Sequence, residues 1–284
     1  MGQNNIIEGG ETIMNNEQTK SHAEEAQNLW EESEKLEFIR GLKAGKSVAE
    51  IMSQLDTAEA FAEKSEVAGC SDGRICDEDE HRLGTAGNGI LLFFDSMFDK
   101  SKDQTKLEKF ILANKGKIKK VKSHDHCGAA KIKFDLMQAA GEKLPEGVNT
   151  SDELGIYYSQ ELARRLGAEY EHTKMLNTMH NERAIYLDGT GKFNPSALPE
   201  LPAGFMCSGP DLGFNPKDQE VELVTLAKIP LGDHGFGERF DKDNPFYIVV
   251  SANNQKQLDE LKEIAERAAS QFNGKIKVDG FIVE

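Results

Sequence analysis

The stretch KIKKVKSHDHCGAAK, residues 117–131, carries the strongest indication of the fold class. Its first part, about residues 117–122, has the length of a short strand, and a helix is expected to begin at Cys127 shortly after it. An earlier strand, over about residues 67–70, ends in a second polar motif, GCSDGR. Strands that alternate with helices in this way are typical of parallel βαβ units. The sequence therefore predicts an α/β fold with a mostly parallel central sheet flanked by helices.

Three segments are expected along the chain. Residues 1–22 are polar and aperiodic, which predicts a disordered N-terminus. Residues 23–195 are expected to form the main domain, which includes a helical N-terminal arm with apolar residues at helical spacing. Residues 196–284 begin with a Pro- and Gly-rich crossing and predict a small α/β C-terminal extension. No internal repeat is visible in the sequence.

Several local patterns predict elements around and beyond that boundary. The segment RAIYLDGTGKF, residues 183–193, has a Gly-containing turn between apolar residues and predicts a β-hairpin. The apolar segment VELVTLAKIPL, residues 221–231, predicts a strand of the C-terminal extension. Further strands are expected over residues 246–252 and 275–284, with a helix over residues 255–272 between them.

The composition excludes several classes of protein. A net charge of −15 predicts repulsion from nucleic acid and from anionic membranes, so neither is expected as a partner. The longest apolar runs, such as GILLFF, are far shorter than the ~20 residues of a membrane-spanning helix. The N-terminus has no basic start followed by an apolar stretch, so no secretory signal is expected and a cytoplasmic location follows. In a reducing cytosol, four cysteines indicate metal binding or catalysis rather than a disulfide scaffold.

The thiol and imidazole groups of the two motifs form a candidate metal site. His124 and Cys127 stand three residues apart, so one loop or helical turn can direct both donors at one point. Cys70 ends the other strand, and ligands bind at the carboxyl ends of strands in open α/β sheets. Zinc prefers thiolate and imidazole ligands, and a Cys2His set leaves its fourth position open for catalysis. Cys76 is the alternative ligand if Cys70 does not bind the metal.

Together the two motifs resemble the signature of the β-class carbonic anhydrases. CSDGR contains the family's C-x-D-x-R pattern, and HDHCG contains its H-x-x-C-G pattern. Cys70 and His124 are 54 residues apart, and TAGNG between them is similar to the family's R-N-A-G-N segment. The resemblance covers about residues 25–195, and the C-terminal extension lies outside it. Only 12 residues separate Cys70 from Arg82, which predicts that the strand usually present between them is shortened or missing.

The resemblance implies a function and a role for each motif residue. Cys70, His124 and Cys127 would bind Zn2+. Asp72 and Arg74 would form the catalytic dyad, in which the guanidinium keeps the carboxylate ionised and away from the metal. The implied enzyme is a lyase that reversibly hydrates carbon dioxide to bicarbonate by a zinc-bound hydroxide. The family also implies a parallel sheet flanked by helices, and a homodimer built partly by the N-terminal helices.

The sequence leaves two alternative functions open. The same zinc chemistry could hydrolyse carbon disulfide or carbonyl sulfide, which are also small linear electrophiles. A non-catalytic, zinc-stabilised interaction protein would instead use the C-terminal extension as its binding surface. The presence of Asp72 and Arg74 favours an enzyme, since a structural zinc needs four closed ligands and no dyad. His126 is a candidate proton shuttle or a surface residue, whereas His180 and the other single histidines are expected to be structural or exposed.

Overall fold

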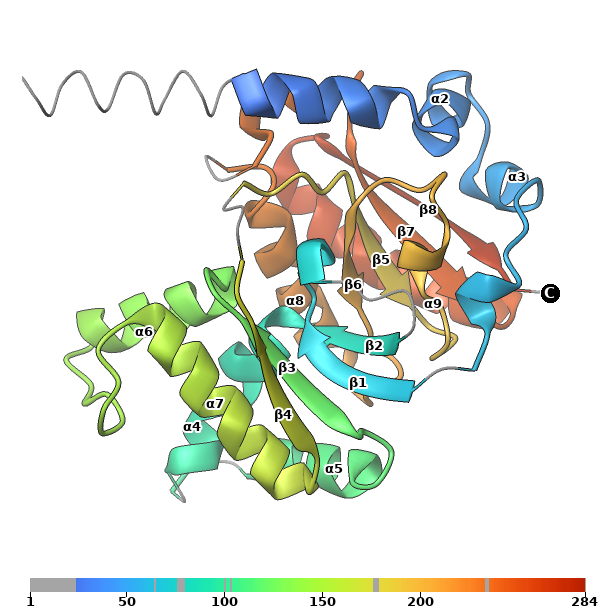
Figure 1. Cartoon of the computed structure of the whole chain (residues 1–284). Helices are drawn as coiled ribbons and strands as arrows, with labels where there is room; N and C mark the ends of the chain where they lie inside the picture. The colour runs from blue at the N-terminus through green and yellow to red at the C-terminus, as the bar shows by residue number, and fades with distance from the viewer. Residues whose placement is uncertain are drawn as a thin grey trace, which may run out of the picture.

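The computed structural model describes residues 24–283 apart from residues 64, 76–79, 100, 103, 176–178 and 233–234. The expected disorder of residues 1–22 therefore concerns a segment outside the described residues. Within the described ranges the chain forms two four-stranded sheets flanked by helices, and the paired strands of both sheets are parallel (Figure 1). The prediction of an α/β fold with parallel strands is confirmed.

The first sheet carries both motifs, and its strand order is β2-β1-β3-β4. The strands span Ser65–Cys70 (β1), Glu80–Thr85 (β2), Lys120–His124 (β3) and Glu169–Thr173 (β4). Because β1 and β3 pair in the middle of the sheet, the motifs at their carboxyl ends lie side by side. The strand expected to be shortened or missing near Arg82 is present as β2, which has 6 residues and includes Arg82, and a short 3-10 turn, Gly73–Ile75 (η2), lies between β1 and β2.

The second sheet has the strand order β6-β5-β7-β8, which repeats the order of the first sheet. Its strands span Ala184–Asp188 (β5), Gly204–Cys207 (β6), Phe246–Ala252 (β7) and Ile276–Ile282 (β8). The boundary expected after residue 195 falls inside the connection between β5 and β6, so the second half of the molecule begins before β5. The C-terminal part is therefore a complete four-stranded unit with the topology of the first.

The helices that follow β1 in the chain also divide between the two halves of the molecule. The first half contains Ile90–Phe98 (α4), Thr105–Asn114 (α5), Gly128–Ala139 (α6) and Ser151–Leu166 (α7), and the second contains Pro216–Lys228 (α8) and Gln255–Ala269 (α9). In the first half α7 packs against β3 and β4, and α6 packs against α7. In the second half α9 packs against β7, β8 and α8. No described helix has both the length and the apolar character that a membrane span requires.

Two local predictions near the boundary are wrong. The segment 221–231 belongs mostly to α8 rather than to a strand, because Asn215 caps that helix, Pro216 opens it, and its apolar residues also fit a helical period. The segment 183–193 is no hairpin, because β5 pairs in parallel with both β6 and β7. Its Gly-containing turn is instead held by the Asp188 carboxylate, which accepts a hydrogen bond of 2.8 Å from the Thr190 amide.

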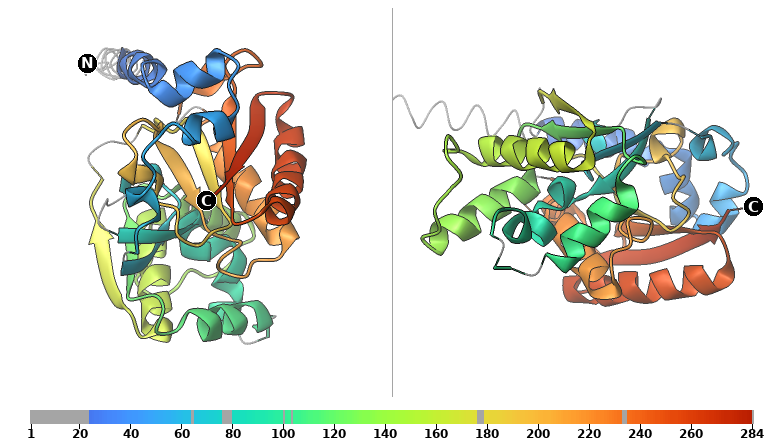
Figure 2. Two further views of the ribbon diagram at one scale, coloured as in Figure 1. Left: turned by 90° about the vertical axis from the view of Figure 1, so that its right-hand side faces the viewer. Right: turned by 90° about the horizontal axis from the view of Figure 1, so that it is seen from below.

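The N-terminal helices pack on the second sheet of their own chain. Residues 24–34 are helical, and Glu37–Lys43 (α2) and Val48–Met52 (α3) follow. Apolar side chains of α2 and α3 join a buried cluster with residues of β5, β6, β7 and β8. Figures 1 and 2 show these helices, in blue, above the second sheet. The N-terminal helices, which the family resemblance expects to take part in a homodimer, thus pack within this chain, and the homodimer itself stays a prediction.

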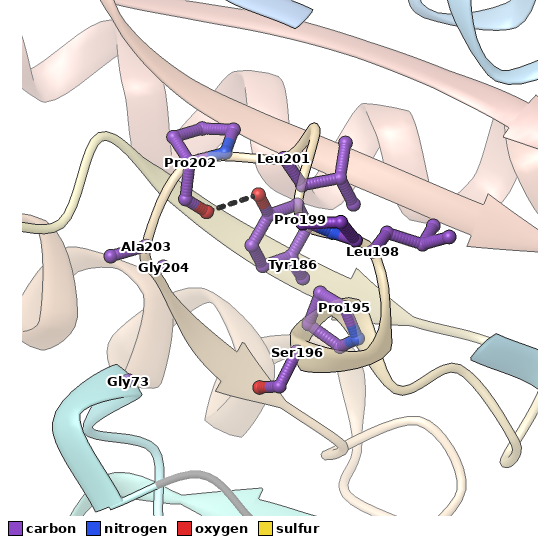
Figure 3. A pocket seen from close by; sticks show the side chains of 10 residues that line it. All are labelled: Gly73, Tyr186, Pro195, Ser196, Leu198, Pro199, Leu201, Pro202, Ala203 and Gly204. Carbon is purple, nitrogen blue, oxygen red and sulfur yellow. Dashed lines mark hydrogen bonds between the residues drawn. The ribbon is translucent and has the colours of Figure 1, made fainter. Parts of the chain in front are cut away.

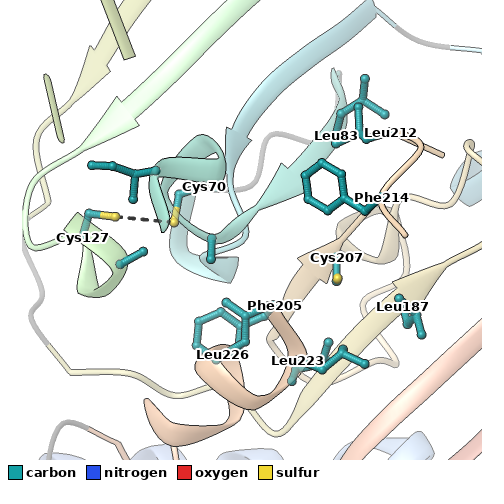
Figure 4. Packing of buried hydrophobic residues seen from close by; sticks show 14 of the residues in the cluster. Cys70, Leu83, Cys127, Leu187, Phe205, Cys207, Leu212, Phe214, Leu223 and Leu226 are labelled. Atoms are coloured by element: carbon teal, nitrogen blue, oxygen red, sulfur yellow. Dashed lines mark hydrogen bonds between the residues drawn. The ribbon is translucent and has the colours of Figure 1, made fainter. Parts of the chain in front are cut away.

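The two sheets meet along β2 and β6 and share one core. The Met206 amide donates to the Ser71 carbonyl and the Ser208 amide to the Gly84 carbonyl, both at 2.8 Å. Leu83 of β2 and Phe205 of β6 belong to a single buried cluster that also includes α8 (Figure 4). The second half is therefore packed directly against the half that contains the motifs.

Candidate metal centre

The structure brings the three predicted metal ligands together. Cys70 is the last residue of β1, His124 is the last residue of β3, and Cys127 immediately precedes α6. All three are buried, and one ligand atom of each lies within 4.8 Å of those of the other two. These residues can therefore hold a metal ion. Cys76, the alternative ligand, lies outside the described residues.

The geometry of these donors suits zinc. The two sulfur atoms lie 3.8 Å apart, and two sulfurs bound about 2.3 Å from one tetrahedral zinc are separated by about 3.8 Å. The Nδ1 atom of His124 lies 2.7 Å from the Asp125 carbonyl oxygen, which places a proton on Nδ1 and leaves the Nε2 lone pair available. That Nε2 atom is buried and has no hydrogen-bond partner among the described residues. A buried imidazole nitrogen without a hydrogen-bond partner, grouped with two sulfurs, is an arrangement that a bound metal would satisfy.

The charges around the sulfurs favour a thiolate. Hydrogen bonding from Cys127, aided by the positive charge of His124, holds the pKa of the Cys70 thiol well below its ordinary value. The thiolate in turn raises the pKa of His124 to about 9, although burial of the imidazole acts in the opposite direction. Metal binding at this site must therefore displace protons.

The TAGNG segment supplies a backbone donor to the same sulfur. Gly87, Asn88 and Gly89 all have positive φ, and this tight turn aims the Gly87 amide at the Cys70 sulfur, 3.4 Å away. A Cβ on Gly87 would lie 2.8 Å from Ile90, so a larger residue does not fit there. Asn88 anchors the turn, because its side-chain amide donates to the Lys122 carbonyl at 2.9 Å and to the Ser159 hydroxyl at 3.0 Å.

Asp72 and Arg74 form the predicted pair beside the metal ligands. One carboxylate oxygen of Asp72 accepts from the Arg74 backbone amide at 3.0 Å and from Nε at 2.9 Å, and the other accepts from Nη2 at 2.5 Å. Burial alone would raise the pKa of Asp72, but these hydrogen bonds and the nearby positive charges hold it well below its usual range. Its Oδ2 atom lies 3.8 Å from the His124 Nε2 atom, so an ionised carboxylate stands next to the candidate metal position.

Arg82 fixes the backbone of the first motif. It extends from β2, is 8% exposed, and donates to the carbonyl oxygens of Asp72 and Ser71. His126, the candidate proton shuttle, has φ of 58°, and its backbone amide donates to Asp152 at 2.8 Å. Its ring lies 3.9 Å from the same carboxylate and is about half exposed. The structure thus places His126 at the surface and Arg82 against the backbone of the first motif.

Three acidic or basic side chains that the motifs do not contain also reach the site. His180 and Glu182 lie in the connection between the two sheets, and the His180 Nε2 atom is 3.2 Å from Nη2 of Arg74. Glu222 extends from α8, and its carboxylate accepts from the Ala86 amide at 2.7 Å and from the Cys207 thiol at 3.3 Å. Burial raises the pKa of Glu222 to about 7. None of the three belongs to a recognisable pattern, because they are isolated residues brought to the site by the packing of the second half.

Two cavities adjoin the motifs. A small one, lined by the metal ligands, also contacts Gly87, Asn88, Ser123, Ala130, Gly155 and Ser159. A larger one of about 150 Å3 lies beside Gly73, and its other lining residues belong to β5 and to the Pro-rich segment 195–204 (Figure 3). Of these two cavities of the described residues, the one lined by the metal ligands is the smaller.

Comparisons with protein-family models, with curated proteins and with solved structures find no match to this chain. Its function is therefore argued from the residues of the site.

Proposed function

We propose that the protein is a zinc-dependent, β-carbonic-anhydrase-like lyase that interconverts carbon dioxide and bicarbonate. Cys70, His124 and Cys127 would hold the zinc ion. The observation that carries the proposal is the ionised carboxylate of Asp72, which is clamped by Arg74 at 3.8 Å from the His124 Nε2 atom. A purely structural zinc site would need a fourth protein ligand, whereas the nearest acid here is already engaged by a guanidinium.

The residues of the chain have distinct tasks in this reaction. Zinc, when bound, lowers the pKa of a water molecule toward about 7 and so supplies a nucleophile at neutral pH. Arg74 keeps Asp72 ionised, and Asp72 can then only accept hydrogen bonds. Its Oδ2 atom faces His124, so it accepts the hydrogen bond of that nucleophile and directs the oxygen lone pair at the carbon of the substrate. Cys70 and Cys127 are only 7% and 6% exposed, so the two sulfurs would have little contact with bulk water.

The test is a comparison of the wild-type protein with Asp72→Asn. The zinc-loaded wild type should hydrate carbon dioxide in a stopped-flow assay, with about one zinc per chain by plasma emission. The variant preserves the size of the side chain but offers an amide, so it should keep zinc and lose most of the turnover. Absence of hydration by the zinc-loaded wild type would refute the proposal, and activity toward carbonyl sulfide or carbon disulfide would then identify the alternative hydrolase. Carbon dioxide as substrate, the homodimer and the cytoplasmic location all stay predictions.

A further inference from the structure

A second group of buried polar residues adjoins the pair formed by Asp72 and Arg74, and one side-chain donor atom each of Asp72, His180 and Glu182 lie within 4.8 Å of one another. His180 is 4% exposed and Glu182 is fully buried, although both belong to a connection between two sheets. The Nδ1 atom of His180 lies 3.1 Å from one carboxylate oxygen of Glu182 and 3.3 Å from the other. Its Nε2 atom lies 3.2 Å from Nη2 of Arg74. Four side chains thus form one continuous chain, in the order Asp72, Arg74, His180 and Glu182.

The donors and acceptors in this chain fix the tautomer of His180. A guanidinium can only donate, so the Nε2 atom that faces Arg74 must be the acceptor and carries no proton. The ring proton is then on Nδ1, where the Glu182 carboxylate accepts it. The opposite tautomer would place an N–H against the N–H of Arg74, where two donors face each other. The ring is also held by Phe205 of β6, whose centroid lies 5.7 Å from that of His180.

We propose that His180 and Glu182 are positioning residues that hold Arg74, and through it Asp72, in the arrangement that keeps the carboxylate off the metal. The effect of His180 on catalysis rests on the proposed function. The contact between His180 and Arg74 does not depend on it. The need for it follows from the short distance between Asp72 and His124. A carboxylate this close to three zinc ligands becomes a fourth ligand as soon as its guanidinium partner turns away.

The second half of the chain thereby takes part in the site of the first half. The connection that carries His180 is anchored one residue after Glu182, where the Arg183 guanidinium lies 3.7 Å from the Trp30 ring centroid. Arg183 also donates to Ser33 at 2.7 Å and to Glu34 at 3.0 Å. His180 is therefore held in place by the N-terminal helix and by β6, both of which lie outside the two motifs.

The first test measures the tautomer of His180 directly and requires no activity. Long-range proton–nitrogen NMR spectra of 15N-histidine-labelled, zinc-loaded protein distinguish a protonated Nδ1 from a protonated Nε2. The His180 signals are identified by their loss in His180→Gln. We expect Nδ1 to carry the proton in the wild type, and a change in the Nε2 signal when Arg74 is replaced by alanine. A His180 ring protonated on Nε2 in the wild type would overturn the proposal.

The second test uses the cobalt-substituted and zinc-loaded proteins. His180→Ala should retain its metal, bind azide at cobalt more weakly than the wild type, and lose about 10- to 100-fold in kcat with little change in KM. His180→Gln keeps an acceptor for Arg74 and should recover most of this loss. Adding Asp72→Ala to His180→Ala should restore azide binding without restoring turnover, because the competing carboxylate is gone. A purely structural role of His180 would not produce this restoration.

The matched control is His81→Gln, which alters another buried histidine of the first half whose Nε2 atom has no hydrogen-bond partner among the described residues. It should leave metal content, azide binding and turnover unchanged. If His180→Ala has the wild-type kcat and azide response, the positioning role is refuted while the proposed function stands. If the tautomer is as proposed but the zinc-loaded wild type does not hydrate carbon dioxide, the proposed function fails and the contact between His180 and Arg74 stands.

Discussion

Replacing Arg74 by alanine tests the central contact of the site. The Arg74 side chain is 8% exposed and that of Asp72 is 2% exposed, so the pair is almost completely removed from water. Removing one partner of a buried ion pair leaves the other charge uncompensated and typically costs about 3 to 5 kcal/mol. We therefore expect Arg74→Ala to lower the free energy of unfolding by about this amount when zinc is removed by a chelator.

Bound zinc should reduce the loss in the free energy of unfolding that Arg74→Ala causes. Once its guanidinium partner is absent, Asp72 can bind the metal as a fourth ligand, because its Oδ2 atom already lies 3.8 Å from the His124 Nε2 atom. In the zinc-loaded variant the carboxylate is again compensated, and the free energy of unfolding should recover. The same coordination closes the open metal position, so carbon dioxide hydration should nearly disappear and azide should no longer alter the visible spectrum of the cobalt-substituted variant.

Urea unfolding with and without zinc, together with stopped-flow hydration and azide titration, measures these effects. The control is the double variant Asp72→Ala with Arg74→Ala, which removes the Asp72 carboxylate together with its guanidinium partner. After zinc removal, the double variant should lose less stability than Arg74→Ala. Its cobalt-substituted form should bind azide, and it should stay inactive because no carboxylate orients the nucleophile. Near-wild-type hydration by Arg74→Ala would refute the role of the pair, and an equal azide response in the single and double variants would refute the coordination by Asp72.

Three further changes test other parts of the structure. Cys127→Ser should lower zinc content well below one per chain, and full zinc occupancy with unchanged activity would show that Cys127 is not a ligand. Burial raises the pKa of Glu222 from 4.5 to about 7. Protonation of this carboxyl group therefore stabilises the native state fully below pH 4.5, and this contribution is lost as the pH rises through about 7. Relative to Glu222→Gln, the wild type should therefore lose about 3 kcal/mol between pH 4.5 and pH 7.5 in urea unfolding, and a constant difference would contradict the buried acid. Trp30→Ala removes the ring beneath Arg183 and should lower the free energy of unfolding by about 2 kcal/mol without changing zinc content, whereas unaltered stability would show that this stacking contributes nothing.

The sequence predicts correctly that the three candidate metal ligands meet, because their positions depend on local structure. Cys70 and His124 each end a strand, and parallel strands bring their carboxyl ends to one edge of the sheet whatever the rest of the chain does. His180 and Glu182 lack such a signal, since they are single residues in a connection and reach Arg74 only through tertiary packing. The segment 221–231 suggests a strand but forms most of α8, because a short apolar run fits a strand and a buried helix equally well.

The glycines of the first half show how the two halves depend on each other. A Cβ on Gly73, inside CSDGR, would lie 2.5 Å from the Gly204 carbonyl oxygen at the start of β6. A Cβ on Gly84, just before TAGNG, would lie 2.3 Å from the Met206 carbonyl oxygen in the same strand. These contacts are with backbone atoms of β6, which cannot move aside as a flexible side chain could. Both positions therefore require glycine while β6 keeps its place. The small residue between Asp72 and Arg74 therefore serves the contact between the halves, while its neighbours form the buried ion pair of the candidate site. A change in the second half that displaces β6 would consequently reach the dyad through the backbone of Gly73, even though it touches none of the metal ligands.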